Sequence, residues 1–178
     1  MMRMKPLLLA ATFLLTACGS GGEGEGNGAA QSKRVSGAAT ASGPIRAGDS
    51  LTGLYEKKEG GLSSQLCIVQ SGGGSSARFG MNLWGGNMHS CSGAGTAVRA
   101  GQQLTLTMEG DRTCTVTARI EGNAIRLPDK VPEGCSYYCG AQARMTGIAL
   151  ARTGTSEADA LKARDVVDEP LCDAPKDG

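Results

Sequence analysis

The sequence predicts a mainly β domain, a small antiparallel barrel or sandwich with a C-terminal helix, stapled by disulfides. Apolar and polar residues alternate along several short stretches, which is the period of a half-buried strand. Turn residues separate these stretches at regular intervals, as they do in barrels and sandwiches. Six cysteines lie in the same region, and an even set of this kind predicts disulfides in an oxidising compartment.

The chain begins with the features of a secretory signal peptide. Arg3 and Lys5 precede the apolar stretch 7–15, and small residues then lead to Cys18, the layout of a signal that is cleaved after export. The apolar stretch is too short to span a bilayer, which takes roughly 20 residues. We therefore expect residues 1–17 to be removed as a signal peptide.

The run Leu15-Thr16-Ala17-Cys18 resembles the lipobox of bacterial lipoproteins. This resemblance implies that the peptide is cut before Cys18, that this cysteine carries fatty acyl groups such as palmitate, and that the lipids anchor the protein to a membrane. Gly19 and Ser20, with no Asp after Cys18, are similar to the pattern that directs such proteins to the outer membrane, facing the periplasm. The alternative is an ordinary cleaved signal followed by a soluble protein.

Residues 18–44 form the expected lipidated cysteine and a flexible tether. This stretch is rich in Gly, Ser, Ala and Asn and has almost no large apolar side chains, so it cannot bury enough surface to offset the entropy of ordering it. Residues 45–178 have the length of one domain. Removal of Arg3 and Lys5 from the 18 basic residues leaves 16 against 17 acidic ones, a balance that disfavours nucleic-acid binding.

Strand candidates follow one another along this domain. In 113–120 every second residue from Cys114 is apolar, and the residues between are Thr or Arg. The run 104–108 alternates in the same way, Glu109-Gly110-Asp111 supplies a turn, and residues 121–123 lead into 124–127, so we expect a three-stranded meander. The remaining candidates are 51–56, 65–70, 77–84, 95–99 and 141–150.

One helix is expected near the end of the chain. Ser156 can cap it, Asp159 favours its first turn, and 158–167 contains good helix formers before Pro170. Such a helix would lie against one face or end of the sheet. The alternative is that the chain from Thr153 onward is a mobile tail.

The six cysteines that follow Cys18 are expected to form three disulfides. Their pairing is open, because six cysteines allow 15 connectivities, and we expect only that Cys172 ties the C-terminal segment to the β-rich body. A zinc site on the Cys135-x-x-x-Cys139 spacing is disfavoured because the other cysteines are scattered and His89 is the only histidine. The candidates are Cys67, Cys91, Cys114, Cys135, Cys139 and Cys172. No metal and no cofactor is expected.

The sequence offers few groups for catalysis, so we expect a protein that is not an enzyme. A nucleophile needs a base to take its proton, and the one candidate is His89, beside Ser90 and Cys91. Adjacent strand residues point to opposite faces, so Ser90 is poorly placed to be activated by His89. The run 72–76 lacks the Lys of a phosphate loop and is interpreted as a hairpin loop.

Two clusters are the candidates for a binding site. The first surrounds a glycine turn and contains Trp84, Asn87, Met88 and His89. The second is Tyr137 and Tyr138, which lie between two cysteines. Amphipathic aromatic residues carry much of the energy of interfaces, but packing of Trp84 and of one tyrosine in the core is the competing interpretation.

The lipobox, the Gly-rich tether and the small Cys-containing β domain resemble uncharacterised small envelope lipoproteins of bacteria. Loosely, the domain is also similar to the barrels of periplasmic lysozyme and metalloprotease inhibitors, because Gly53-Leu54-Tyr55 opens the first strand much as Gly-x-Trp opens lipocalin-like barrels. We expect a non-catalytic, lipid-anchored envelope protein that binds a protein or a cell-wall (peptidoglycan) partner and could inhibit a lytic enzyme. The alternatives are a carrier of a small apolar ligand and a hydrolase that uses His89.

Overall fold

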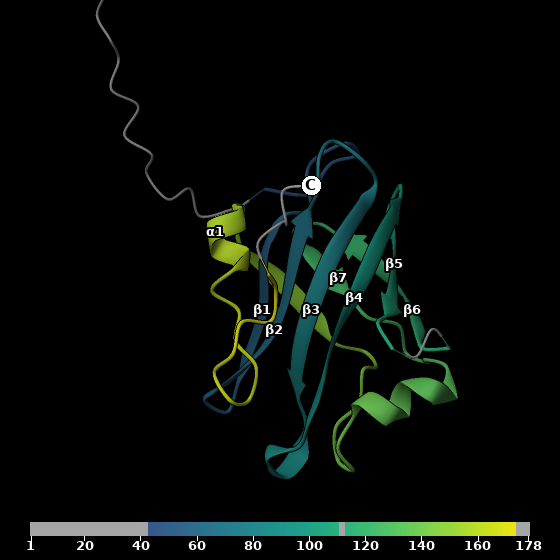
Figure 1. The fold of residues 1–178 in the computed structure, drawn as a ribbon, viewed down its shortest axis with the longest axis vertical. Coiled ribbons are helices and arrows are strands. Elements are labelled where there is room, and N and C mark those ends of the chain that lie inside the picture. Colours follow the sequence, from purple (N-terminus) through teal and green to yellow (C-terminus); the bar gives the residue numbers. More distant parts are fainter. Residues whose placement is uncertain (1–42, 111–112, 174–178) are drawn as a thin grey trace, which may run out of the picture. The chain divides into compact units, whose positions relative to one another are not determined.

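The computed structural model describes residues 43–110 and 113–173. Within these residues, eight antiparallel strands form a closed barrel, in which each strand pairs with the next and β8 pairs back with β1 (Figure 1). The prediction of a mainly β, disulfide-stapled fold is confirmed, and of the two architectures left open by the sequence the barrel is the one that forms. Cys18, the expected signal peptide and almost all of the expected tether lie outside the described residues.

Two-residue turns join three of the consecutive strand pairs, and the other connections are longer. The strands are β1 (Gly53–Glu59), β2 (Leu62–Gln70), β3 (Ser76–Trp84), β4 (Ser90–Ala100), β5 (Gln103–Met108), β6 (Thr115–Glu121), β7 (Ala124–Arg126) and β8 (Ala149–Gly154). Two 3₁₀ turns, η1 (Gly86–Met88) and η2 (Glu133–Tyr138), and one short helix, α1 (Glu157–Ala160), complete the described elements.

Most predicted strands form close to their expected places. The meander β5–β6–β7 is confirmed, and the run 72–76 connects β2 to β3 as a hairpin loop. The strand expected at 141–150 is wrong over most of its length, because β8 begins only at Ala149. Residues before it turn back on themselves: the Ala143 amide donates to the Gly140 carbonyl (3.0 Å) and the Gly147 amide to the Pro128 carbonyl (2.9 Å).

The interior of the barrel is packed with side chains. On β5 and β6 the apolar positions given by alternation are all buried, so the alternation correctly predicted which side chains face the barrel interior. The largest fully buried side chains are Tyr55, Phe79, Leu51, Leu66, Ile68, Met81, Leu83, Leu104, Leu106, Met108, Ile125 and Leu127. An eight-stranded barrel has an interior that such side chains can fill.

Residues 45–52 close the end of the barrel at which β1 begins, here called the upper end. Ile45 and Leu51 are buried in the main core. Two arginines hold the backbone of this segment: Arg99 donates to the carbonyls of Arg46 (2.9 Å) and Asp49 (2.7 Å). From β8, Arg152 donates to the carbonyls of Ser50 (2.9 Å) and Thr52 (2.6 Å), and its guanidinium lies 5.7 Å from the Tyr55 ring centroid.

Closure of the barrel depends on a close approach of β1 to β8. The pairing shifts register between Leu54 and Tyr55, the sign of a bulge or irregularity. At this point Gly53 has a φ of +152° and a side chain there would collide with the carbonyl of Gly154. Glycine is therefore required where the first strand meets the last.

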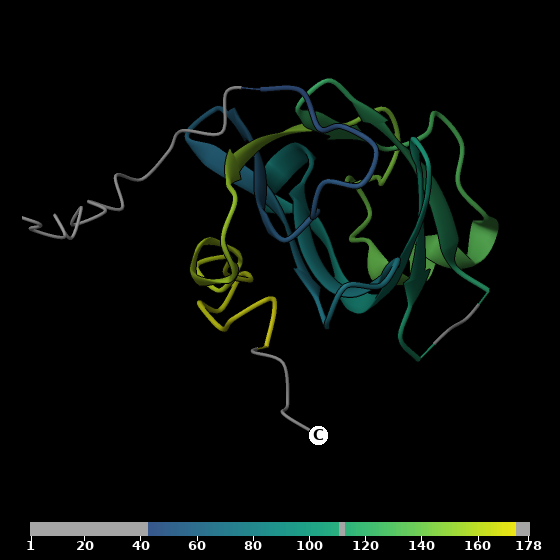
Figure 2. The ribbon, with the colours of Figure 1, turned by 90° about the horizontal axis from the view of Figure 1, so that it is seen from above.

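The predicted C-terminal helix is much shorter than expected. Ser156 caps α1 as expected, and with Asp159 it forms a reciprocal capping box. The helix ends at Ala160, so the expectation over 158–167 is wrong beyond that residue. Residues 161–173, here called the strap, instead run along the outside of the barrel (Figure 2). The mobile-tail alternative is also wrong for the described part of this segment, because the strap is packed.

The strap is held against β1 and β2 by a second apolar cluster. Its buried members are Leu54, Cys67, Val69, Ala160, Ala163 and Cys172. The disulfide Cys67–Cys172 confirms that Cys172 ties the C-terminal segment to the sheet. A side chain at Gly80 would collide with the carbonyl of Leu171, so this glycine lets the strap lie directly on β3.

Tyr55 predicts a loss of stability at alkaline pH. Burial raises the pKa of its hydroxyl to about 12 from a usual 10.0, although Arg152 and Arg99 oppose the shift. The unfolded chain therefore releases this proton at lower pH than the folded protein. The free energy of unfolding should be unaffected below pH 10 and should fall by up to about 2 to 3 kcal/mol as the pH rises to about 12.

Urea unfolding of the wild type and of Tyr55→Phe across this pH range measures the effect. Tyr55→Phe should lose this part of the pH dependence, at the expense of the hydrogen bond from the hydroxyl to the Leu51 carbonyl (2.8 Å). The exposed Tyr137→Phe is the control and should behave as the wild type does. Equal pH dependence in the wild type and Tyr55→Phe would contradict the prediction.

Candidate functional site

A disulfide-linked cap covers part of the lower end of the barrel, which is the end at which β3 and β7 finish. The cap is the segment 127–148 between β7 and β8, and it contains η2. Cys139 of the cap is bonded to Cys91 on β4, and Cys135 is bonded to Cys114 just before β6. Both cysteines of the Cys135-x-x-x-Cys139 motif are therefore in disulfides and have no free thiolate for a metal.

The β3–β4 turn docks onto this cap. The Asn87 side-chain amide donates to the Gln142 side-chain oxygen (2.8 Å), and the Gly86 amide donates to the Gln142 carbonyl (3.0 Å). The Gly140 amide donates to the Ser90 carbonyl (2.9 Å). Together with the Cys91–Cys139 disulfide, these bonds make the turn and the cap one surface.

Met88 stands at the tip of this turn in an unusual conformation. Asn87 and Met88 have φ values of 49° and 61°, in the left-handed region that is uncommon for residues other than glycine. Met88 is 66% exposed. Such backbone strain persists only where the surroundings hold it, and it concentrates at functional positions.

The two tyrosines have different environments. Tyr137 is 83% exposed, whereas Tyr138 packs against the main core and donates from its hydroxyl to the Glu109 carbonyl (2.9 Å). Their rings meet edge to face with centroids 5.6 Å apart. One tyrosine therefore anchors η2 and supports the other, which faces solvent.

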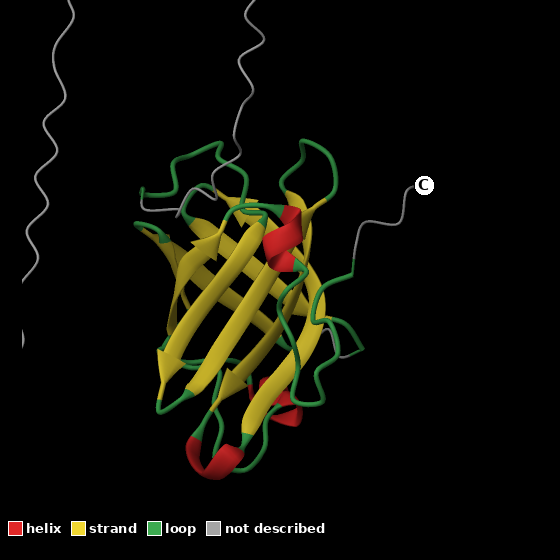
Figure 3. Cartoon of the chain, turned by 90° about the vertical axis from the view of Figure 1, so that its left-hand side faces the viewer, coloured by secondary structure: helices red, strands yellow, loops and turns green. Residues whose placement is uncertain are grey.

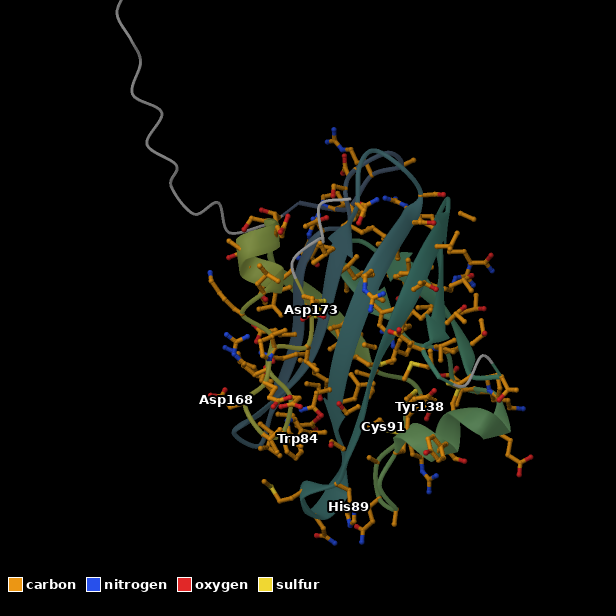
Figure 4. All side chains as sticks on the ribbon, in the orientation of Figure 1. Trp84, His89, Cys91, Tyr138, Asp168 and Asp173 are labelled. Atoms are coloured by element: carbon orange, nitrogen blue, oxygen red, sulfur yellow. A yellow bond between two sulfur atoms is a disulfide. The ribbon has the colours of Figure 1, made fainter. Side chains whose placement is uncertain are left out.

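Trp84 lies apart from the tyrosines. It ends β3 half-buried, and its amide donates to the Ser64 hydroxyl (2.9 Å). Figure 4 shows Trp84 and Tyr138 on opposite sides of Cys91. Trp84 instead lines an opening of about 330 Å³ with Lys57, Glu59 and Leu62. The structure thus places Asn87, Met88 and His89 in a turn bonded to the cap that carries Tyr137 and Tyr138, whereas Trp84 lines a separate opening to which Ile148 of the cap also contributes.

A mainly apolar pocket of about 350 Å³ lies within the cap itself. Both walls belong to the cap, because its lining comes from η2 with the residues before it and from the chain 139–146 that follows. Its apolar lining includes Val131, Pro132, Ala143 and Met145, and the exposed Glu133 and Arg144 also line it. Its volume and its mainly apolar lining with a few charged side chains are within the range of ligand pockets.

The surroundings of His89 give no support to a nucleophilic site. The ring packs against Gly140, where any side chain would collide with it. Cys91 is in a disulfide and is not a thiol nucleophile. Within residues 43–110 and 113–173, no hydrogen bond joins the His89 ring to a hydroxyl or a carboxylate, the two partners that a triad requires. In the same ranges, no three His, Cys, Asp or Glu side chains gather as metal ligands.

No known protein family, no curated protein and no solved structure matches this chain. The candidate site is therefore defined by its own geometry. Within the described part of the chain, no helix is both long enough and apolar enough to cross a membrane.

The sequence did not indicate the cap or the pocket inside it. Apart from η2, the region 127–148 contains no helix and no strand, and the strand wrongly expected at 141–150 overlaps it. The pair Cys135 and Cys139 is the signal that could have revealed the cap. Each of these cysteines bonds to a different partner on the barrel, so the short segment between them is held at two points.

Removal of the Cys91–Cys139 disulfide should separate the β3–β4 turn from the cap. Cys91→Ala combined with Cys139→Ala should lower the free energy of unfolding by about 2 to 4 kcal/mol. It should also accelerate amide hydrogen exchange at residues 86–89 and 140–142. The matched control is Cys67→Ala with Cys172→Ala, which removes a disulfide but frees the strap instead. Similar exchange at residues 86–89 in the two variants would show that the disulfide does not fix the site.

Proposed function

We propose that this chain is a non-catalytic, lipid-anchored protein of the bacterial envelope that binds a partner through the cap. The observation that carries the proposal is the pair of exposed apolar side chains, Met88 and Tyr137, on two segments that the Cys91–Cys139 disulfide and its neighbouring hydrogen bonds lock together. A protein or a cell-wall (peptidoglycan) component is the partner class.

Rigidity is what makes these side chains suitable for binding. Exposed apolar side chains release free energy when a partner covers them, at about 25 cal/mol per Å². Loops that are already ordered lose little entropy on association. Tyr and Met are also side-chain types that interfaces favour. The cap also contains an apolar pocket.

The anchor is the second part of the proposal. Cys18 and the Gly-rich residues that follow would hold the barrel near the outer membrane, facing the periplasm, while leaving it free to turn. Three disulfides suit this location because an oxidising compartment preserves them. Two or more acyl chains are needed for stable attachment, since a single chain binds only reversibly.

Binding at the surface is favoured over the two alternatives on specific grounds. A carrier that encloses an apolar ligand within the barrel needs a cavity there, and the barrel interior is filled by large side chains from Tyr55 to Leu127. A hydrolase needs His89 beside a nucleophile, and its neighbour Cys91 is oxidised.

A more specific version of the proposal is that the protein inhibits a lytic enzyme. The cap would then block the active-site cleft of a lysozyme or of a secreted protease. Purified oxidised protein is assayed against enzymes of both kinds, with Met88→Ala combined with Tyr137→Ala as the variant expected to be weaker. Unimpaired activity of all of these enzymes would reject the inhibitor form.

Photo-crosslinking tests the binding surface in cells. A photoreactive residue placed at Met88, and separately at Tyr137, should capture the same protein or glycan fragment, identified by mass spectrometry. Val98 is the matched control, because it is an exposed apolar residue (44%) on the wall of the barrel in β4. No adduct at either position, in protein shown to be folded and lipidated, would overturn the proposal.

Cys18→Ser tests the anchor. Loss of the sulfur removes the site of the first acyl chain, so the variant should leave the membrane fraction and should no longer incorporate labelled palmitate. Fractionation of cells and metabolic labelling measure the two effects. A Cys18→Ser protein that stays in the outer-membrane fraction would show that lipidation at Cys18 is not the anchor.

A further inference from the structure

The strap carries a projecting loop, Asp165–Glu169, that the cap proposal leaves unexplained. It is here called the acidic loop. It projects from the strap alongside β1 and β2, toward the lower end of the barrel (Figure 3). Figure 1 shows the same course, and Figure 4 places its residue Asp168 at the level of Trp84. The acidic loop therefore lies outside the cap but faces the same end of the molecule.

Hydrogen bonds fix the shape of the acidic loop. Arg164 and Pro170 pair as a β-bridge at its base, and the Asp165 amide donates to the Glu169 carbonyl (2.9 Å). The Asp165 carboxylate accepts from the amides of Val167 (2.9 Å) and Glu169 (2.8 Å). Asp168 takes the left-handed φ of 66° that closes the turn. The loop is thus ordered before any partner arrives.

The base of the loop is attached firmly to the barrel. The Arg164 amide donates to the Gln65 side-chain oxygen on β2 (2.9 Å), and the Leu171 amide donates to the Ala163 carbonyl (3.0 Å). Ala163 is buried, and Cys172 is bonded to Cys67. Movement of the tip relative to the barrel is therefore restricted.

Two valines form the tip of the loop. Val166 is 52% exposed and Val167 is 69% exposed. Valine is branched at Cβ and has few rotamers, so little side-chain entropy is lost when it is buried. Adjacent exposed valines on an ordered turn are a small apolar contact that is preorganised for a recess in another protein.

Carboxylates surround this apolar tip. Asp165, Asp168 and Glu169 belong to the loop, and the Asp165 carboxylate accepts from the Val167 and Glu169 amides. The neighbouring cation, Arg164, donates to the carbonyls of Leu161 (2.7 Å) and Ala163 (3.1 Å), and its Nε lies 4.0 Å from the Asp168 carboxylate. Lys162 is paired with Asp159. The loop therefore presents a negative rim that attracts basic surfaces and repels acidic ones.

The geometry points to a partner protein whose docking surface is an apolar recess rimmed by lysine or arginine, with Val166 and Val167 in the recess and Asp168 and Glu169 on the rim. The inference rests on the proposed function, because it gives the partner of the cap a second contact. It also defines the chemistry of that partner, which the uncharged side chains of Met88 and Tyr137 leave open.

The first experiment locates the contact. A photoreactive residue is placed at Val167 in the full-length, lipidated protein in its own cells, with Val98 on the barrel wall as the matched control. The captured protein should be the one captured from Met88 or Tyr137, and the crosslinked peptide should lie in an apolar recess that contains lysine or arginine. Capture alone is not sufficient support, because the chemistry of the captured surface is what is tested.

The second experiment measures the affinity of the purified partner at low and high salt. Val166→Ser combined with Val167→Ser should weaken binding roughly tenfold, since an apolar contact is lost. Asp168→Asn combined with Glu169→Gln should weaken binding at low salt and reduce its salt dependence. Both variants change exposed positions and should unfold at the wild-type temperature. Val98→Ser should bind as the wild type does.

The outcomes separate this inference from the proposed function. A partner captured from Met88 or Tyr137 but not from Val167 overturns the inference and leaves the proposed function intact. A captured surface without lysine or arginine, or unchanged affinity of the two loop variants, also overturns it. Empty results at all three positions overturn both.

Discussion

Each of the three disulfides ties a segment outside the sheet to the barrel, and the surfaces of interest depend on this constraint. Cys67 holds the strap, and Cys91 and Cys114 hold the two ends of η2. Neither the cap nor the strap has an extended helix or strand of its own, so neither could order itself by backbone hydrogen bonds alone. Disulfides stabilise by restricting the unfolded chain, and here they also decide where non-repetitive segments lie.

The closed barrel provides the rigid body to which these segments attach. Closure leaves the sheet without the unpaired edges that cause aggregation, and it requires Gly53 where β1 meets β8. Large side chains fill the interior, so the barrel acts as a scaffold. The surfaces available to bind a partner are its ends and its outer wall. Loops on rigid scaffolds are where binding residues concentrate.

The two proposed contact surfaces, the cap and the acidic loop, differ in chemistry and would contribute differently to the binding of a partner. The cap offers an apolar pocket, and the cap and the turn bonded to it expose Tyr137 and Met88, which favours affinity through buried area. The acidic loop adds two valines inside a rim of carboxylates, which favours selection among partners by charge. Since the chain has a formal net charge of only +1, this selectivity comes from where the charges lie and not from the net charge.

The sequence by itself determined the β class and the facing of β5 and β6, because these follow from local alternation. Turn residues predicted the turn between β2 and β3. The even number of cysteines predicted disulfides, and the expected tie from Cys172 to the sheet is one of them. The sequence also singled out Met88 and Tyr137. Only the tertiary structure decided the partners of Cys91 and Cys114, the cap at 127–148, the end of α1 at Ala160 and the course of the strap. Residues beyond Ala160 have good helix propensity, but they do not form a helix because the chain instead buries Ala163 and Cys172 against β2. Contacts between residues far apart in the chain made these choices, and no local pattern records such contacts.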